Sequence, residues 1–208
     1  MIGRNFTFAG LAALAILFSG GTADAGDKVL FYMHGSDLHG KSAGHKDVKN
    51  YEKVVSHLDD AGFDVVFEIR PDRDTEAETV RTAKMVKDRI IAGTAPEDIY
   101  IGGFSYGAMI SLKVAGLVGD NAVNVALFCD CPEDPSIPVE INYKAVKGRV
   151  LSIVDTEDQK FGSCEGRLPN VTDFTEKTIT SGKGHKVFKL GKGKFIKKWA
   201  PLFIDWAG

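Results

Sequence analysis

The sequence predicts an α/β fold: a three-layer sandwich with a mostly parallel sheet of about six strands and helices on both faces. Short apolar runs alternate with helical patterns six times along the chain. The apolar runs are continuous, which is typical of strands buried on both faces. Glycine or proline separates many of these segments, as at Gly62 and Pro96.

Residues 1–25 have the composition of a secretory signal peptide. Arg4 supplies a positive charge, residues 6–18 are apolar, and Ala23-Asp24-Ala25 fits a small-x-small cleavage site. The apolar run is shorter than the roughly 20 residues of a membrane span. We therefore expect an exported protein, periplasmic or secreted, whose mature chain, residues 26–208, forms one domain without stable membrane insertion.

The composition is that of an ordinary globular domain. The 208 residues carry a formal net charge of −2, and 44% of them are hydrophobic. The balanced charge gives no reason to expect a nucleic-acid partner, and the apolar content excludes a disordered chain. No histidine and carboxylate cluster has the spacing of a metal site, so we expect neither a metal nor another cofactor.

The predicted strands are short apolar runs. The first ends at His34-Gly35, and the second is closed by Arg70-Pro71. In a parallel sheet the working groups lie at the C-terminal ends of the strands. We expect strands over residues 28–33, 63–69, 98–102, 123–128, 149–154 and 174–180.

Helical spacing and end signals predict the helices. Thr75-Glu76-Ala77-Glu78 reads as a capping box at the start of the second helix. The C-terminal helix, which we expect to be interrupted near Pro201, should pack against the sheet through Trp199, Phe203 and Trp206. The first helix is predicted by the apolar positions Tyr51, Val54, Val55 and Leu58. Helices are expected over 47–61, 75–92, 108–118 and 194–206, and residues 133–147 should be irregular.

The segment Gly103-Phe104-Ser105-Tyr106-Gly107 lies between an apolar run and a helical pattern. A strand, a sharp glycine-flanked turn and a helix form the context of a nucleophile elbow. The turn strains the serine backbone, so its flanking positions must be almost free of side chain. The helix N-terminus then favours negative charge that develops beside the hydroxyl. We expect Ser105 to be a nucleophile.

A serine nucleophile needs a base, which is usually histidine. His185 lies in a glycine-bearing loop directly after the last predicted strand, where it can reach Ser105. We expect His39 and His45 to lie in a solvated loop, with a position lining a pocket as the alternative, and His57 to face solvent from the first helix.

The histidine in turn needs a carboxylate partner. Asp158, on the loop after the strand 149–154, is the favoured candidate. Asp155, nearer that strand, and Asp130, after the preceding strand, remain alternatives. The backbone N–H groups of Tyr106 and Ser36 are the expected donors of an oxyanion hole.

Together these motifs resemble a small α/β-hydrolase. The similarity covers nearly the whole mature region: the His34-Gly35 turn, the elbow at Ser105, the turn Thr156-Glu157-Asp158 and the Gly184-His185 loop. More narrowly, the chain is similar to compact exported bacterial hydrolases. The resemblance implies Ser105 as nucleophile, Asp158 as acid and His185 as base, in the chain order of the family. The chain departs from larger members in lacking early antiparallel strands and a cap domain.

The expected activity is hydrolysis of a small-molecule carboxylic ester through an acyl-enzyme. Cleavage of a thioester, amide or lactone is an alternative that the sequence does not separate. A non-catalytic exported binding protein on the same fold is the alternative from another functional class, because one fold hosts many functions.

The three cysteines are Cys129, Cys131 and Cys164, so at most one internal disulfide forms. Export permits a disulfide. Cys129 and Cys131 would bridge each other only with strain, which favours Cys164 pairing with one of them. Cys131–Cys164 is the candidate, and three reduced thiols are the alternative.

Two groups of cations remain open to interpretation. Arg70 is either an anion contact at a strand end or a surface partner of Asp72 or Asp74. The C-terminal lysines either draw anionic substrates or a membrane surface to the site, or form a solvated face. They are Lys183, Lys186, Lys189, Lys192, Lys194, Lys197 and Lys198.

Overall fold

The computed structural model describes residues 28–129, 131–132 and 139–208. It contains a six-stranded sheet in the order β2-β1-β3-β4-β6-β8, in which every neighbouring pair is parallel. The predicted fold class is therefore confirmed. The strands are β1 (Lys28–Met33), β2 (Phe63–Val66), β3 (Ile99–Phe104), β4 (Asn124–Phe128), β6 (Arg149–Asp155) and β8 (Asp173–Ile179).

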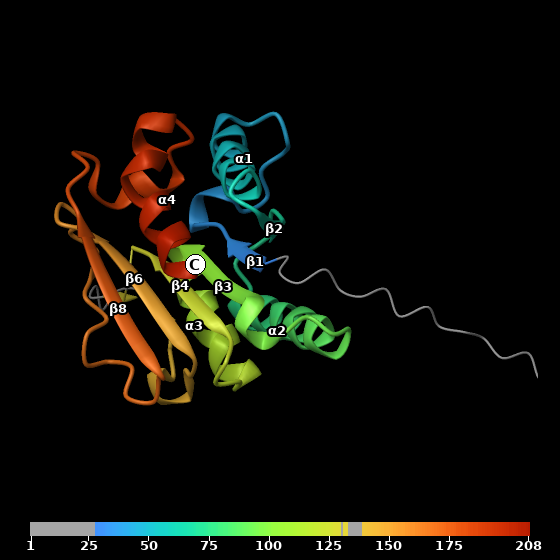
Figure 1. Cartoon of the computed structure of the whole chain (residues 1–208). Helices are drawn as coiled ribbons and strands as arrows, with labels where there is room; N and C mark the ends of the chain where they lie inside the picture. The colour runs from blue at the N-terminus through green and yellow to red at the C-terminus, as the bar shows by residue number, and fades with distance from the viewer. Residues whose placement is uncertain (1–27, 130, 133–138) are drawn as a thin grey trace, which may run out of the picture.

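Helices cover both faces of this sheet (Figure 1). α1 (Lys46–Asp59) and α4 (Gly193–Ala207) lie on one face, and α2 (Thr75–Ile91) and α3 (Tyr106–Val118) lie on the other. Successive side chains of β1 point to opposite faces of the sheet and so contribute to the two helical layers in turn. Leu30 and Tyr32 join the core under α1 and α4, whereas Val29, Phe31 and Met33 join the core under α2 and α3. Both faces are therefore buried.

The strand register brings distant loops to one edge of the sheet. Met33 pairs with Gly103, Phe104 with Phe128, and Asp155 with Ile179. The loops that follow β1, β3, β6 and β8 therefore leave from the same edge. Four short 3₁₀ turns complete the described chain: η1 (Ser36–Leu38), η2 (Pro96–Asp98), η3 (Tyr143–Ala145) and η4 (Gly184–Lys189).

A two-stranded sheet lies beside the main one. β5 (Cys131–Pro132) pairs antiparallel with β7 (Phe161–Gly162), and a disulfide joins Cys131 to Cys164. The cysteines are 33 residues apart, and closing such a loop contributes about 3.5 kcal/mol in the chain-entropy treatment. Cys129 is buried and does not take part in this disulfide.

Three local predictions are wrong. β2 ends at Val66 rather than residue 69, because only Phe63–Val66 pairs with β1. The N-cap of α2 is Asp74 and not Thr75 of the predicted capping box, because the Asp74 carboxylate accepts the Ala77 N–H at 3.0 Å. α4 continues through Pro201, which lies on its exposed side while Trp199 and Phe203 are fully buried against the sheet. That burial offsets the hydrogen bond that the proline cannot donate.

The expected signal peptide, the alternative acid Asp130 and residues 133–138 of the expected irregular segment lie outside the described residues. Within the part of the chain that the structure describes, no helix has the length and apolar character needed to cross a membrane.

Candidate active site

Ser105 lies in a strained turn between β3 and α3. Its backbone angles are φ 57° and ψ −120°, a region that non-glycine residues rarely adopt. The flanking positions must be glycine because there is no room there for a side chain. A Cβ on Gly103 would lie 2.6 Å from the Gly107 carbonyl, and a Cβ on Gly107 would lie 2.1 Å from the Met33 oxygen. The first turn of α3 therefore lies directly against the end of β1.

His185 joins Ser105 to Asp158. Its Nε2 lies 2.8 Å from Ser105 Oγ, and its Nδ1 lies 2.7 Å from Asp158 Oδ2. The Asp158 side chain is 1% exposed. A carboxylate only accepts hydrogen bonds, so Nδ1 donates to Asp158 and the Nε2 lone pair faces the serine hydroxyl. This tautomer suits removal of the Ser105 proton.

Backbone and aromatic contacts hold the acid and the imidazole. Asp158 Oδ1 accepts the N–H groups of Lys160 at 2.9 Å and Phe161 at 3.3 Å. The Phe161 ring stacks on the His185 imidazole with centroids 4.8 Å apart, and Phe104 contacts the imidazole at the same centroid separation. His185 lies in η4 rather than in the glycine-bearing loop that the sequence predicted. The imidazole thus contacts two aromatic side chains.

The alternative acid Asp155 does not contact His185. Its Oδ1 accepts the Glu157 N–H at 3.0 Å, and its Oδ2 accepts the Ser181 hydroxyl. Asp155 is buried, and it ties the turn that carries Asp158 to the loop that precedes η4. Its role in the described chain is thus structural.

A pocket of about 690 Å³ opens beside Ser105 and His185. Ser36 and Tyr106, the expected oxyanion donors, both line it, as the first residues of η1 and α3. Phe104, Met109 and Phe161 supply apolar walls. The size and the mixture of apolar and polar groups suit a small organic ligand.

The loop that carries Ser36 is held from below by a buried cluster that the sequence interpretation missed. His34 Nε2 accepts the Arg70 backbone N–H at 2.9 Å, and His34 Nδ1 lies 2.6 Å from the Gly35 oxygen. The Arg70 guanidinium donates to the His34 carbonyl and, at 3.4 Å, to His39 Nε2. Because Nε2 accepts and Nδ1 donates, His34 is neutral.

Burial, with Arg70 as the next cause, lowers the pKa of His34 to about 3. Burial likewise lowers the pKa of Arg70 to about 10. Arg70 is 4% exposed, so its expected role as a surface partner of Asp72 or Asp74 is wrong. The guanidinium turns inward because the His34 carbonyl, at the end of β1, needs a donor. The sequence signal was weak: a single arginine before a proline.

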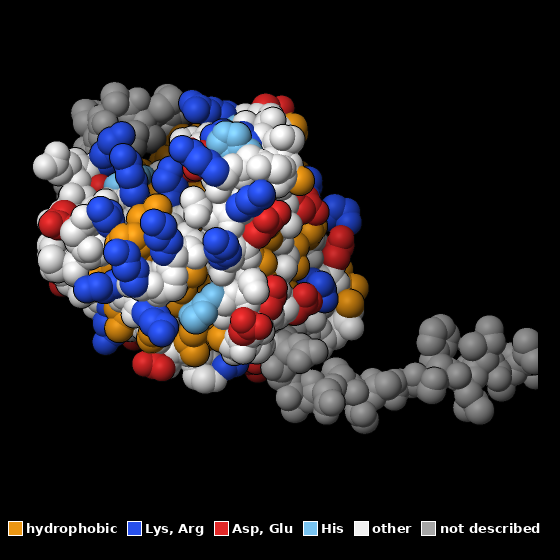
Figure 2. Space-filling view, turned by 90° about the horizontal axis from the view of Figure 1, so that it is seen from above, with side chains coloured by type: hydrophobic (Ala, Val, Ile, Leu, Met, Phe, Trp, Pro, Cys, Tyr) orange, Lys and Arg blue, Asp and Glu red, His pale blue; other side chains and the backbone are white. Residues whose placement is uncertain are grey.

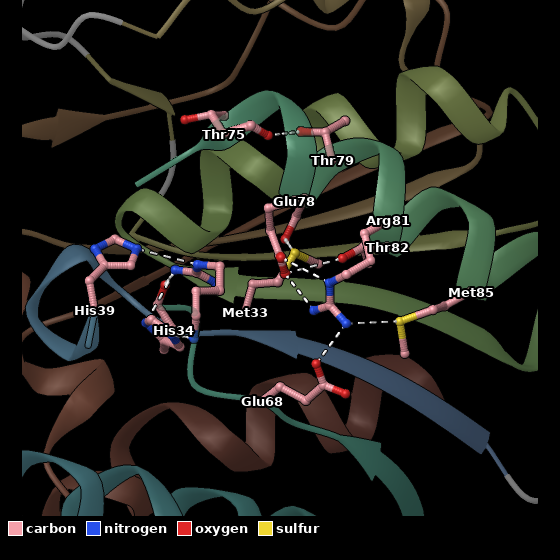
Figure 3. A network of polar contacts seen from close by, with 12 residues as sticks. Met33, His34, His39, Glu68, Thr75, Glu78, Thr79, Arg81, Thr82 and Met85 are labelled. Atoms are coloured by element: carbon pink, nitrogen blue, oxygen red, sulfur yellow. Dashed lines mark hydrogen bonds and ion pairs between the residues drawn. The ribbon is translucent and has the colours of Figure 1, made fainter. Parts of the chain in front are cut away.

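Figure 3 shows how this cluster continues beneath α2. His34 and His39 lie on one side of the view, and Glu78 and Arg81 of α2 lie on the other. Arg81 bonds Glu78 at 3.0 Å and Glu68 at 2.6 Å. These contacts join α2 to the segment that leads from β2 to Arg70.

A second set of bonds holds the Ser36 loop from the α1 side. The Gly35 N–H donates to the Tyr51 hydroxyl at 3.0 Å, and this hydroxyl donates to Asp37 Oδ1 at 3.1 Å. Lys189 of η4 lies 2.7 Å from Asp37 Oδ2. Tyr51 was predicted only as a core residue of the first helix. Its hydroxyl couples the loop after β1 to the turn that carries His185.

The other histidines have separate roles. His39 is only half-exposed, with its ring 5.5 Å from that of Tyr106, and burial lowers its pKa. The expected solvated position for His39 is therefore wrong. His45 caps α1 by accepting the Asp47 N–H at 3.2 Å. Among the described residues, no group of three or more His, Cys, Asp or Glu side chains could hold a metal ion.

Because Gly107 lies so close to the Met33 backbone, adding one methyl group at position 107 should strongly destabilise the fold. Gly107→Ala should lower the free energy of unfolding by more than about 3 kcal/mol, because the Met33 backbone cannot yield to the added Cβ. Gly44→Ala is the matched control, since a Cβ there meets nothing within 4 Å. It should change stability by less than about 0.5 kcal/mol in urea unfolding. Equal stability of the two variants would contradict this account of the elbow.

The lowered pKa of His34 predicts a loss of stability in acid. Below about pH 6.5 the unfolded chain binds a proton at His34, and the folded chain does not do so until about pH 3. The free energy of unfolding should therefore fall within this window, by up to about 1.4 kcal/mol per pH unit. His34→Gln should be less stable at pH 7 but should show a shallower fall. Urea unfolding between pH 7 and pH 4 measures both slopes, and identical slopes would refute the assignment.

Comparisons with known proteins identify the fold. No protein-family profile matches the sequence, and no curated protein matches it significantly. Among solved structures, the chain is similar to SOBER1 of Arabidopsis thaliana, with a TM-score of 0.54 and 16% identity over 86% of this chain and 98% of that one. It is also similar to a monoacylglycerol lipase of Paleococcus ferrophilus, with a TM-score of 0.57 and 16% identity over 86% and 93%.

A third similar structure, from Xanthomonas campestris pv. campestris, is described as a hydrolase of the α/β superfamily. Its TM-score is 0.51, with 12% identity over 88% of this chain and 98% of that one. At these identities the comparisons bear on architecture only. The parallel sheet, its two helical layers and these structural neighbours give the chain the α/β-hydrolase fold.

Proposed function

We propose that this protein is a serine hydrolase that cleaves a carboxylic ester through an acyl-enzyme. The observation that carries the proposal is the pair of contacts at His185: 2.8 Å to Ser105 Oγ and 2.7 Å to Asp158 Oδ2. Nucleophile, base and orienting acid are thus within hydrogen-bond reach, beside a pocket with apolar walls.

In the first half of the reaction, His185 Nε2 takes the Ser105 proton while Oγ bonds to the ester carbonyl carbon. The carbonyl electron pair moves to oxygen, which accepts hydrogen bonds from the N–H groups of Ser36 and Tyr106. The electron pair then returns, the carbon–alkoxy bond breaks, and His185 gives its proton to the leaving alcohol. The products of this half are the alcohol and an acyl-Ser105 ester.

In the second half, water replaces the alcohol. His185 takes a proton from water as the water oxygen attacks the acyl carbon. The bond between the acyl carbon and Ser105 Oγ then breaks, His185 returns the proton to Oγ, and the carboxylic acid leaves. Asp158 stabilises the imidazolium in both halves and keeps Nε2 directed at the serine. The rings of Phe104 and Phe161 restrict rotation of the imidazole, which keeps the base in position between the two steps.

Ser105→Ala tests this mechanism. The variant should fold normally and lose at least about 10³-fold in kcat for 4-nitrophenyl acyl esters, because no other group forms the acyl-enzyme. A fluorophosphonate probe should label the wild-type protein at Ser105 and leave the variant unlabelled.

Ser56→Ala, at an exposed position of α1, is the control and should keep wild-type turnover and labelling. Turnover by Ser105→Ala at the wild-type rate would refute the mechanism. A folded wild-type protein that neither turns over esters nor reacts with the probe would favour the binding-protein alternative.

We also propose that the protein is exported to the periplasm or secreted. The composition of residues 1–25 supports this, and so does the Cys131–Cys164 disulfide, since disulfides persist in oxidising compartments. Mass spectrometry of the protein recovered from the exported fraction should find Gly26 at the N-terminus. Recovery only in the cytosol with residues 1–25 intact would contradict the proposal.

A further inference from the structure

The mouth of the pocket beside Ser105 is strongly cationic. Four of its lining residues are Arg or Lys, and the single carboxylate among them is Asp37. Asp37 is already paired with Lys189 at 2.7 Å. The remaining cations are Arg73, Lys160 and Lys186, all three exposed. The whole chain, in contrast, has a formal net charge of −2, so this concentration is local.

These three cations come from three separate segments, each of which contacts or adjoins a residue of the proposed triad or its neighbour. The Arg73 carbonyl accepts the hydroxyl of Tyr106, the residue after Ser105, at 2.9 Å. The Lys160 N–H donates to Asp158 Oδ1 at 2.9 Å. Lys186 directly follows His185 in η4. Arg73 precedes Lys160 by 87 residues, and Lys186 follows Lys160 by 26, so the fold brings positive charge to one pocket mouth from segments that are distant in sequence.

Among the described residues, none of these three side chains forms an ion pair. The carboxylates nearest to Arg73 in sequence are used elsewhere. Asp72 accepts the Asp74 N–H at 2.9 Å, and Asp74 caps α2. Three cations at the mouth of an apolar-walled pocket make an environment that favours an anion.

The lysines of the C-terminal segment extend this field. Residues 181–204 contain seven lysines and no Asp or Glu. Figure 2, which looks onto α1 and α4, shows Lys and Arg side chains gathered over the α4 side of this face. Such a field raises the local concentration of anionic small molecules and steers them to the surface.

We propose that the substrate is an ester carrying a negatively charged group, a carboxylate or a phosphate, which Arg73, Lys160 and Lys186 bind at the pocket mouth while the ester lies at Ser105. This inference rests on the esterase function proposed above. Apolar contacts with Phe104, Met109 and Phe161 hold the hydrocarbon part. The three cations then determine specificity by charge and take no part in bond breaking.

The experiment compares esters of matched length and different charge. The neutral ester is 4-nitrophenyl pentanoate, and the anionic ester is 4-nitrophenyl hemiglutarate. A third ester, 3-carboxy-4-nitrophenyl pentanoate, carries the charge on the alcohol side and reports which part of the substrate faces the cations. Each kcat/KM is divided by the rate of hydroxide-catalysed hydrolysis, which removes intrinsic reactivity.

The wild-type enzyme should prefer at least one anionic ester by about 10-fold or more at low ionic strength, and added salt should reduce that preference. In Arg73→Gln/Lys160→Gln the preference should fall by about 3- to 10-fold. Lys197→Gln/Lys198→Gln is the matched control, because it removes two exposed positive charges of α4 that do not line the pocket. It should keep the wild-type preference.

Two outcomes would overturn the inference. One is wild-type turnover of the neutral ester without preference for either anionic ester, which leaves the esterase function intact. The other is an equal fall in both double variants, which assigns the preference to the overall field and not to the pocket mouth. Failure to turn over any ester, with no fluorophosphonate labelling of Ser105, would remove the esterase function and this inference together.

Discussion

The contact between the first turn of α3 and the end of β1 is the constraint on which the site depends. Gly107 lies so close to the Met33 carbonyl that a single methyl group would overlap it. This close contact leaves Ser105 in a backbone conformation that non-glycine residues rarely adopt. It also brings the serine beside the loop that leaves β1. The proposed nucleophile Ser105 and the expected oxyanion donor Ser36 thus depend on one backbone contact, which only glycine permits.

Polar groups buried beneath the pocket hold the loop after β1. Arg70 donates to the His34 carbonyl from inside the protein, and Tyr51 accepts the Gly35 N–H from the α1 side. A buried arginine carries a desolvation cost, which lowers its pKa. In return, the His34 carbonyl, at the end of a central strand, gains a donor. The loop is therefore positioned by bonds on both sides.

The loops that carry the proposed acid, Asp158, and the proposed base, His185, are held by different contacts. Asp158 accepts two backbone N–H groups, and Phe161 of β7 stacks on His185. β7 pairs with β5, and the Cys131–Cys164 disulfide closes this small sheet. The ring that stacks on His185 thus belongs to a small sheet that a covalent cross-link closes. The compact fold has no cap domain among its described residues, so these short loops shape the pocket.

Sequence alone determined the architecture and the identity of the candidate nucleophile and base. The spacing of apolar residues, the composition of the strands and the positions of glycine between elements are local properties. They specify strands, helices and a strained turn wherever they occur. The residues at strand ends follow directly from that architecture. For the acid, however, the sequence left Asp155, Asp158 and Asp130 open, because adjacent carboxylates differ in direction and not in type.

Only the tertiary structure decided how the supporting residues are used. Arg70 points inward, His39 is half-buried, and Asp155 bonds Ser181 rather than His185. Each of these outcomes depends on which unsatisfied donor or acceptor lies nearby in space, often across 26 residues or more. The convergence of Arg73, Lys160 and Lys186 at one pocket mouth has the same origin. No local pattern encodes such neighbours, because they arise from the packing of separate strand ends at one edge of the sheet.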